Sequence, residues 1–138
     1  MLWVWLMYSD FINEYINRYC SYSGNQESNF AIETSLSIPK GNMEEFLKCD
    51  LHNVILYIDV KTLNPRKYRK YTGKSIRPLI RNLKMLITLA KMSKSNMIIR
   101  VPKIDGFVNE RDREATILKL RNMGFSNFDK FTYQVPQK

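Results

Sequence analysis

Residues 53–75, NVILYIDVKTLNPRKYRKYTGKS, join an apolar run to a run of cations. The first eight of them form an almost continuous apolar segment, which is typical of a parallel strand with both faces covered. Asp59 and Lys61 stand where this segment stops. Pro65 suits the first turn of a helix, because the N–H that proline lacks has no partner there. The stretch therefore predicts a buried strand, a polar strand end and a short basic helix in succession.

The alternation of strand and helix continues on both sides of this stretch. Apolar periodicity predicts strands at residues 29–34, 53–60, 96–101 and 128–135, and helices at residues 9–19, 42–49, 77–92 and 110–123. Asn109 and Gly124 are suitable cap residues for the last of these helices. Strands that alternate with helices favour a parallel sheet with right-handed crossovers. We therefore predict an α/β fold in which residues 1–138 form a single domain, with an open parallel sheet flanked by helices.

Composition limits the functional classes. The chain has 138 residues, a formal net charge of +9 and a pI of about 9.6, which favours acidic partners. No apolar run approaches the roughly 18 residues of a membrane span, and neither GxGxxG nor GxxxxGKS is present. The two cysteines, Cys20 and Cys49, lack CxxC spacing. The simplest expectation is a cytoplasmic protein without a disulfide framework, a zinc site or a membrane anchor.

Polar residues occur at the ends of three successive predicted strands. They are Glu33, Thr34, Asp59, Lys61 and Arg100. Because ligands of parallel α/β folds bind at the carboxyl ends of the strands, these residues are candidates for a binding site. The structural alternative is a set of ordinary solvated ion pairs, which are common at strand ends.

The basic run has two interpretations. Six cations between residues 66 and 77 are interleaved with two tyrosines, and this pattern suits a nucleic-acid surface. The same pattern also describes the rim of a site with a solvated helix behind it. We favour the rim, because net charge is weakly specific, so a nucleic-acid partner is not expected. A basic nucleic-acid-binding or protein-interaction module remains the alternative function.

Four segments together resemble the glycyl-radical-enzyme activating enzymes, which are radical S-adenosylmethionine proteins related to the pyruvate formate-lyase activating enzyme. The segments are FAIETS, YIDVKTLNPRKYRKYTGKS, IRNLKML and IIRVPKIDGFVNERDREATI. They match, in order, a strand ending in Asp/Glu-Thr, a strand ending in Asp-x-Lys before a Tyr-Thr-Gly segment, and an Arg-x-Pro strand with a Gly/Asn-containing loop. LMYSDFINEYI resembles the segment that comes after the family's Gly-Gly-Glu-Pro motif.

Two departures from the family pattern set further expectations. The family's C-x3-C-x2-C segment, which ligates a four-iron, four-sulfur cluster, is absent, and Trp3, Val4 and Trp5 stand in place of Gly-Gly-Glu-Pro. Tyr133 is followed by Gln134, where the family usually has histidine. We expect the chain to be the C-terminal part of such an enzyme, arising from truncation, a frame shift or a cut domain.

The resemblance also implies a binding site. It assigns the lining of an S-adenosylmethionine pocket to Glu33, Thr34, Asp59 and Lys61, and the methionine or ribose side to Arg100. The oxygens of the first three would also suit a monovalent cation. The partner would be a glycyl-radical enzyme, from which the family removes a glycine hydrogen through a 5′-deoxyadenosyl radical. Without the cluster cysteines, the chain alone is expected to be inactive.

The resemblance further implies an incomplete barrel. The chain supplies four strands and a short fifth at residues 2–6, fewer than the family's TIM-like βα barrel. We expect a partial barrel in which the first residues pair in parallel beside residues 29–34. Free edges of such a sheet expose unpaired backbone groups, so self-association through the open sheet edges is also expected.

Overall fold

The computed structural model describes residues 2–3 and 30–133. The strands are β1 (Leu2–Trp3), β2 (Phe30–Thr34), β3 (Val54–Asp59), β4 (Met97–Ile104) and β5 (Asn127–Tyr133). The helices are α2 (Lys40–Leu47), α3 (Pro65–Thr72), α4 (Arg77–Leu89) and α5 (Glu110–Met123), with a 3₁₀ turn, η1, at Lys94–Asn96. None of these described helices is long and apolar enough to cross a bilayer. The helix expected at residues 9–19 lies outside the described residues.

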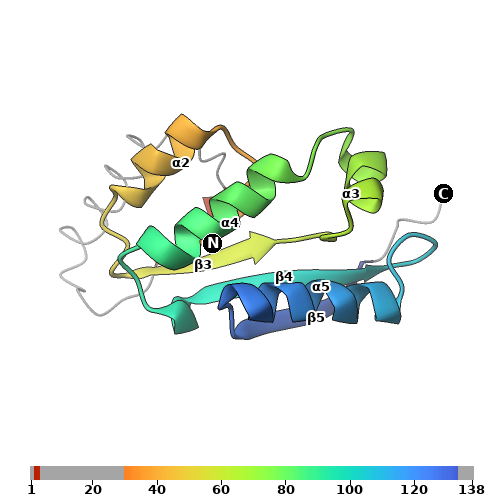
Figure 1. The fold of residues 1–138 in the computed structure, drawn as a ribbon. Helices are drawn as coiled ribbons and strands as arrows, with labels where there is room; N and C mark the ends of the chain where they lie inside the picture. Colours follow the sequence, from red (N-terminus) through yellow and green to blue (C-terminus); the bar gives the residue numbers. More distant parts are fainter. Residues whose placement is uncertain (1, 4–29, 134–138) are drawn as a thin grey trace.

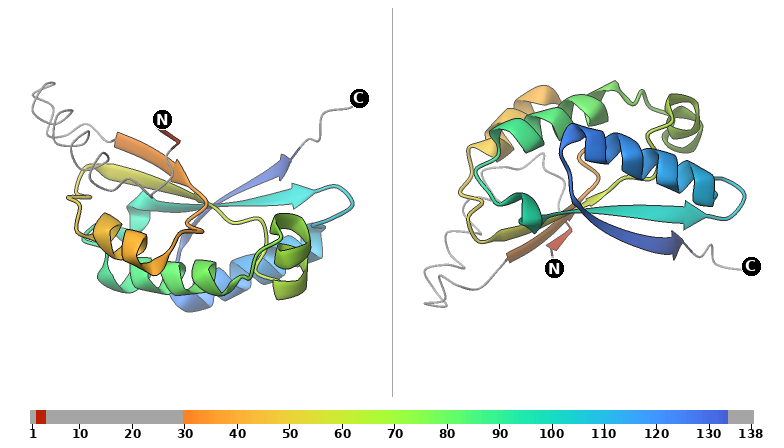
Figure 2. Two further views of the ribbon diagram at one scale, coloured as in Figure 1. Left: turned by 90° about the horizontal axis from the view of Figure 1, so that it is seen from above. Right: turned by 60° about the horizontal axis from the view of Figure 1, so that its bottom comes forward.

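The five strands form one parallel sheet in the order β1-β2-β3-β4-β5. Figure 1 shows β3, β4 and β5 next to one another, and Figure 2 shows β2 beside β3. The four helices all lie on one face of this sheet. Sequential strand order with right-handed crossovers keeps every helix on the same side, which is the arrangement of a βα barrel. The prediction of an α/β fold with an open parallel sheet, a partial TIM-like barrel, is confirmed. The expected parallel pairing beside β2 is present for the first two residues of the predicted strand, since Leu2 pairs with Ile32 and Trp3 with Glu33, while residues 4–6 lie outside the described residues.

The core lies between the sheet and its helical layer. Alternate residues of β3, namely Val54, Leu56 and Ile58, are fully buried beneath the helices. On α4, Leu79, Leu83 and Leu86 provide the apolar stripe that packs on them. The intervening strand residues face the other side of the sheet and are only partly buried. This second face is therefore where charged side chains can be placed.

Two elements differ in length from their predicted bounds. β4 continues to Ile104, three residues beyond the expected end, and includes Pro102. The Arg100 carbonyl accepts from the Val60 N–H, so the backbone of Pro102 faces the same side, just past the end of β3. Pro102 has no N–H to extend the β3–β4 ladder, and the pairing of these two strands ends at this point. α4 ends at Leu89 rather than at residue 92, because Ala90 turns to extended backbone.

Candidate functional site at the strand ends

The end of β3 holds a close ion pair. Asp59 is its last residue and Lys61 comes two positions later, with 2.7 Å between Lys61 Nζ and Asp59 Oδ2. The side chains are 22% and 15% exposed for Lys61 and Asp59 respectively. The second carboxylate oxygen, Asp59 Oδ1, is buried and has no hydrogen-bond partner among the described residues. A buried acceptor without a donor is costly, so this atom is a candidate contact for a ligand.

A second group of charges lies beside the first on the same face. Arg100 is the register partner of both Asp59 on β3 and Asp129 on β5. Its guanidinium donates to Glu33 Oε1 at 2.7 Å and to Asp129 Oδ2 at 3.3 Å. The Arg100 guanidinium also lies 4.6 Å from the ring centre of Phe131. Four strands thus contribute to one constellation, which we call the strand-end cluster: Glu33, Asp59, Lys61, Arg100 and Asp129.

Thr34 does not join this cluster. It is the next residue along β2 after Glu33, so its side chain points to the opposite, helix-covered face, where it is 3% exposed. The Thr34 hydroxyl accepts the backbone N–H of Leu36 at 3.0 Å. The structure therefore brings together four of the five residues singled out from the sequence, and Thr34 instead shapes the turn after β2.

The turn after β2 is anchored by a residue that sequence reasoning missed. Asn82 is fully buried on α4, and its side-chain amide donates to the carbonyls of Leu36 and Ile38, both at 2.8 Å. Arg81 adds a third bond to Ile38 O at 3.1 Å. These contacts hold Leu36 at its positive φ of 59°. The sequence did contain a sign of this role, because Asn82 is a polar residue within the apolar stripe of a helix.

The loop after β3 is anchored in the same way. The Leu63 N–H donates to Thr116 Oγ1 on α5 at 3.2 Å, and the Asn64 side chain caps α3 by accepting from Lys67 N. These bonds fix the short connection that carries Lys61. Beside it opens a cavity of about 320 Å³, lined by Ser35, Ser37, Asp59, Lys61, Tyr68, Tyr71, Thr72, Lys74 and Leu79. The cavity places the Asp59–Lys61 pair at a surface that a small molecule can reach.

β5 supplies two further residues: Asp129, which the sequence did not single out, and Tyr133, which the sequence marked only by the Gln134 that follows it. Asp129 bonds Arg100, and the ring of Tyr133 lies 5.4 Å from Lys61 Nζ. Residues 129, 131 and 133 alternate along β5, so they share one face of the sheet. That alternation was visible in FDKFTYQV, but only the strand register shows that this face meets Arg100.

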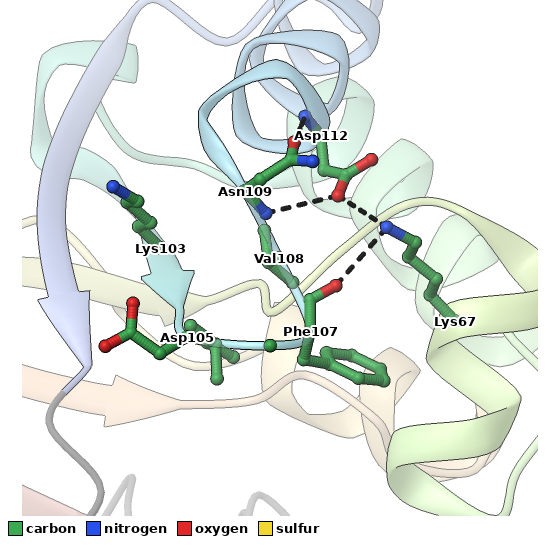
Figure 3. Close-up of a pocket in the computed structure, with 9 residues that line it drawn as sticks. Lys67, Lys103, Asp105, Phe107, Val108, Asn109 and Asp112 are labelled. Carbon is green, nitrogen blue, oxygen red and sulfur yellow. Dashed lines mark hydrogen bonds and ion pairs between the residues drawn. The ribbon is translucent and has the colours of Figure 1, made fainter.

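A second polar cluster lies at the N-terminus of α5 and is shown in Figure 3. Lys67 Nζ of α3 donates to the Asp112 carboxylate and to the carbonyl of Phe107 at 3.3 Å. Asp112 and Asn109 form a reciprocal capping box, at 3.1 and 2.9 Å. The Lys67 ammonium and the Asn109 N–H hold the pKa of Asp112 below its usual range. We call Lys67, Phe107, Asn109 and Asp112 the cap cluster.

The donors present do not suit a thiolate-bound metal. Within the described part of the chain, no group of three or more His, Cys, Asp or Glu residues is placed to hold a metal ion. Cys49 is buried, with its thiol directed at Glu45 O. Oxygen acceptors and cationic donors, by contrast, suit a polar organic ligand with charges of both signs.

No protein-family model matches this chain, whereas comparison with individual proteins does give matches. The chain is 24% identical over 147 residues to an indoleacetate decarboxylase activating enzyme from Tractidigestivibacter scatoligenes. The chain is similar to activating enzymes of this kind. The alignment includes 95% of the chain but 44% of the relative, so the chain spans less than half the length of the curated relative it matches.

A solved structure supports the fold. A domain of the pyruvate-formate lyase-activating enzyme from Bacteroides vulgatus superposes with a TM-score of 0.52 at 15% sequence identity. The match covers 91% of this chain and 92% of that domain. The resemblance to activating enzymes predicted from the ordered motifs is therefore confirmed, and the open α/β sheet is a fold found in a domain of such an enzyme.

Proposed function

We propose that this chain is the C-terminal part of a radical S-adenosylmethionine activating enzyme that installs a glycyl radical on a partner enzyme in the cytoplasm. Within it, the strand-end cluster forms part of the S-adenosylmethionine pocket. The observation that carries the proposal is the buried Asp59 Oδ1, which has no partner among the described residues and belongs to a side chain that lines the cavity at the end of the parallel sheet. The similarity to an activating enzyme supports the wider assignment.

The charge of the cluster supports this ligand. Three carboxylates and two cations give it a net charge of −1. S-Adenosylmethionine carries a sulfonium, an ammonium and a carboxylate, so its net charge is +1. Opposite net charges favour binding in a partly buried site, where screening by water is reduced. A ligand with charges of both signs also finds acceptors and donors side by side.

Each residue has a role that its chemistry suggests. Asp59 Oδ1 accepts from a hydroxyl or ammonium of the ligand, since it is the buried acceptor of the cluster that lacks a donor among the described residues. Lys61 and Arg100 attract the methionine carboxylate. Glu33 and Asp129 hold the Arg100 guanidinium on the sheet face, at 2.7 and 3.3 Å. Thr34 shapes the adjoining turn through its bond to Leu36.

The chemistry that the family draws from bound S-adenosylmethionine is reductive formation of a 5′-deoxyadenosyl radical at an iron–sulfur cluster. The residues of this chain do not fit such a cluster. Its two cysteines cannot supply three thiolate ligands. We therefore propose that the chain contributes positioning of S-adenosylmethionine and has no radical activity alone.

Calorimetry tests the proposed pocket. Titration of S-adenosylmethionine into the chain should show saturable binding, and S-adenosylhomocysteine should bind more weakly because it lacks the sulfonium charge. Asp59→Asn should weaken binding about tenfold, the usual effect of losing a charged contact. Asp105→Asn, in the exposed loop after β4, is the matched control. Absence of binding, or equal binding by Asp59→Asn, would contradict the proposal.

A reconstitution experiment tests the expected inactivity. After treatment with iron and sulfide, the chain should show no four-iron, four-sulfur absorption, and dithionite with S-adenosylmethionine should give no 5′-deoxyadenosine above background. A folded domain of a related enzyme that carries its own cluster cysteines is the positive control. Product from the chain alone would overturn the assignment of a purely positioning role.

Self-association through the open sheet edges is the remaining proposal about partners. β5 is the last strand in the sheet order, and its residues Lys130 and Thr132 are exposed. An exposed edge strand is a template for pairing with another chain. Light scattering over a concentration series should show the mass rising with concentration. A constant monomer mass would contradict this.

A further inference from the structure

A second surface lies on α4, away from the strand-end cluster. A groove of about 460 Å³ runs along the helix and is lined by Ile76, Arg77, Ile80, Arg81, Lys84 and Met85. These residues recur at spacings of three and four, so they share one stripe of α4. Figure 1 shows α4 in the helical layer, running opposite to β3. The groove therefore lies on the helical side of the sheet.

The groove combines an aliphatic floor with a cationic rim. Ile80 and Met85 are partly exposed although both pack against the core cluster. Arg77 and Lys84 are exposed and have no ion pair within the described part of the chain. Arg81 is held over the groove by its bond to Ile38 O at 3.1 Å. Among the described residues, no carboxylate lines the groove.

The neighbouring helix does not neutralise this rim. α2 packs beside α4 and carries two carboxylates, Glu44 and Glu45. Each is paired with a lysine nearby in the sequence, Glu44 with Lys40 at 3.8 Å and Glu45 with Lys48 at 2.9 Å. The cations along α4 thus remain available to a partner that brings its own negative charge.

We propose that the α4 groove binds an acidic amphipathic helix of another protein. The apolar side of such a helix covers Ile80 and Met85, and its carboxylates face Arg77 and Lys84. A second copy of this chain is a poorer occupant of this groove, because the cationic rim needs a surface rich in carboxylates and the chain has 22 Lys and Arg against 13 Asp and Glu. Nucleic acid fits poorly too, because the lining contains no aromatic ring for base stacking. This inference is independent of the S-adenosylmethionine pocket.

The test uses a defined probe rather than an unknown partner. A fluorescein-labelled synthetic helix of about 18 residues, about five turns, carries leucine on one face and glutamate on the other. Its anisotropy is measured on titration with the full chain at low and moderate salt. A scrambled peptide of identical composition and a single-stranded oligouridine serve as competing ligands. Saturable binding of the amphipathic peptide, weakened by salt and tighter than both competitors, is the expected result.

Paired variants locate the binding surface. Arg77→Glu with Lys84→Glu should weaken the amphipathic peptide about tenfold or more, since two attractions become repulsions. Arg77→Gln with Lys84→Gln is a milder second pair that should weaken it less. Arg111→Glu with Lys119→Glu, on the exposed side of α5, makes the same change in net charge elsewhere and should leave binding within about twofold.

Several outcomes would overturn the proposal. Equal binding of the scrambled peptide would show attraction by charge alone. Tighter binding of oligouridine would assign the surface to nucleic acid. An equal loss in the α5 control pair, or no saturable binding by the chain, would remove the groove as the site. Thermal unfolding of every variant shows that each comparison is made between folded proteins.

Discussion

The strand-end cluster and the cap cluster are built from the same kinds of side chain but differ in how completely they are satisfied. In the cap cluster, Asp112 accepts from both Lys67 and the Asn109 N–H, and Lys67 also bonds Phe107 O. In the strand-end cluster, Asp59 bonds Lys61 through one oxygen, and the other oxygen is buried without a partner among the described residues. Both bonds to Asp112 end on Oδ2, but among the described residues no buried side-chain atom of the cap cluster lacks a partner, whereas the strand-end cluster has one, Asp59 Oδ1.

The difference separates a structural role from a binding role. A complete set of hydrogen bonds at a helix N-terminus stabilises the helix, because it satisfies the N–H groups that have no partner inside it. A buried acceptor without a donor destabilises the fold, and binding of a ligand that supplies the donor is one function that offsets this cost. We therefore expect substitutions in the cap cluster to lower stability and substitutions in the strand-end cluster to lower ligand affinity.

The largest effect on stability is expected from Asp112→Ala. The change removes the Lys67 ion pair and half of the capping box, which together contribute about 1–2 kcal/mol. The unfolding midpoint should fall by about 5 °C, measured by far-UV circular dichroism. Asp105→Ala in the adjacent exposed loop is the control and should change it little. An unchanged midpoint in Asp112→Ala would break the proposed contrast.

The second prediction, with a smaller expected effect, is the pH dependence of the difference in unfolding midpoint between wild type and Asp112→Ala. The pKa of Asp112 in the folded chain is lowered, first by the Lys67 side chain and then by the Asn109 N–H. Its contribution to stability is therefore complete above the ordinary aspartate pKa and is lost as pH falls through the lowered one. The midpoint difference between wild type and Asp112→Ala should be constant near neutral pH and shrink below about pH 4. A difference that grows in acid would contradict the sign.

The smallest effect on stability is expected from Asp59→Asn. The substitution weakens the Lys61 pair but also removes a negative charge whose second oxygen is buried without a donor. These opposing effects should keep the free energy of unfolding within about 1 kcal/mol of wild type in urea titrations. A loss as large as that of Asp112→Ala would make the strand-end cluster structural as well.

Local signals made the backbone of this fold predictable. The apolar run that became β3 and the caps Asn109 and Gly124 each depend on neighbouring residues, and the structure has β3 at Val54–Asp59 and α5 at Glu110–Met123. Asp59 and Lys61 could be singled out because a strand end shows in the sequence. Asp129 could not, because its contact with Arg100 depends on the β4–β5 register.

Thr34 and Asn82 also show that tertiary contacts cannot be predicted from residue type alone. Thr34 stands beside Glu33 in the sequence, yet strand alternation turns its hydroxyl to the Leu36 N–H on the other face. In the sequence, Asn82 is a polar residue that interrupts an apolar helix face. Its role depends on the packing of α4 against the turn after β2, which places two carbonyls within reach of its amide. Residue type indicated candidates, whereas the face of the sheet and the tertiary contacts determined which of them meet.

The most direct test of the contrast between a binding cluster and a structural cluster is ligand-induced thermal stabilisation. It is measured for wild type, Asp59→Asn and Asp112→Ala. Each is melted with and without saturating S-adenosylmethionine, which raises the midpoint of a protein that binds it. We expect Asp112→Ala to start lower and keep the full ligand shift. Asp59→Asn should start near wild type and lose most of its shift. A full shift in Asp59→Asn, or its loss in Asp112→Ala, would contradict the assignment of the strand-end cluster as the binding site.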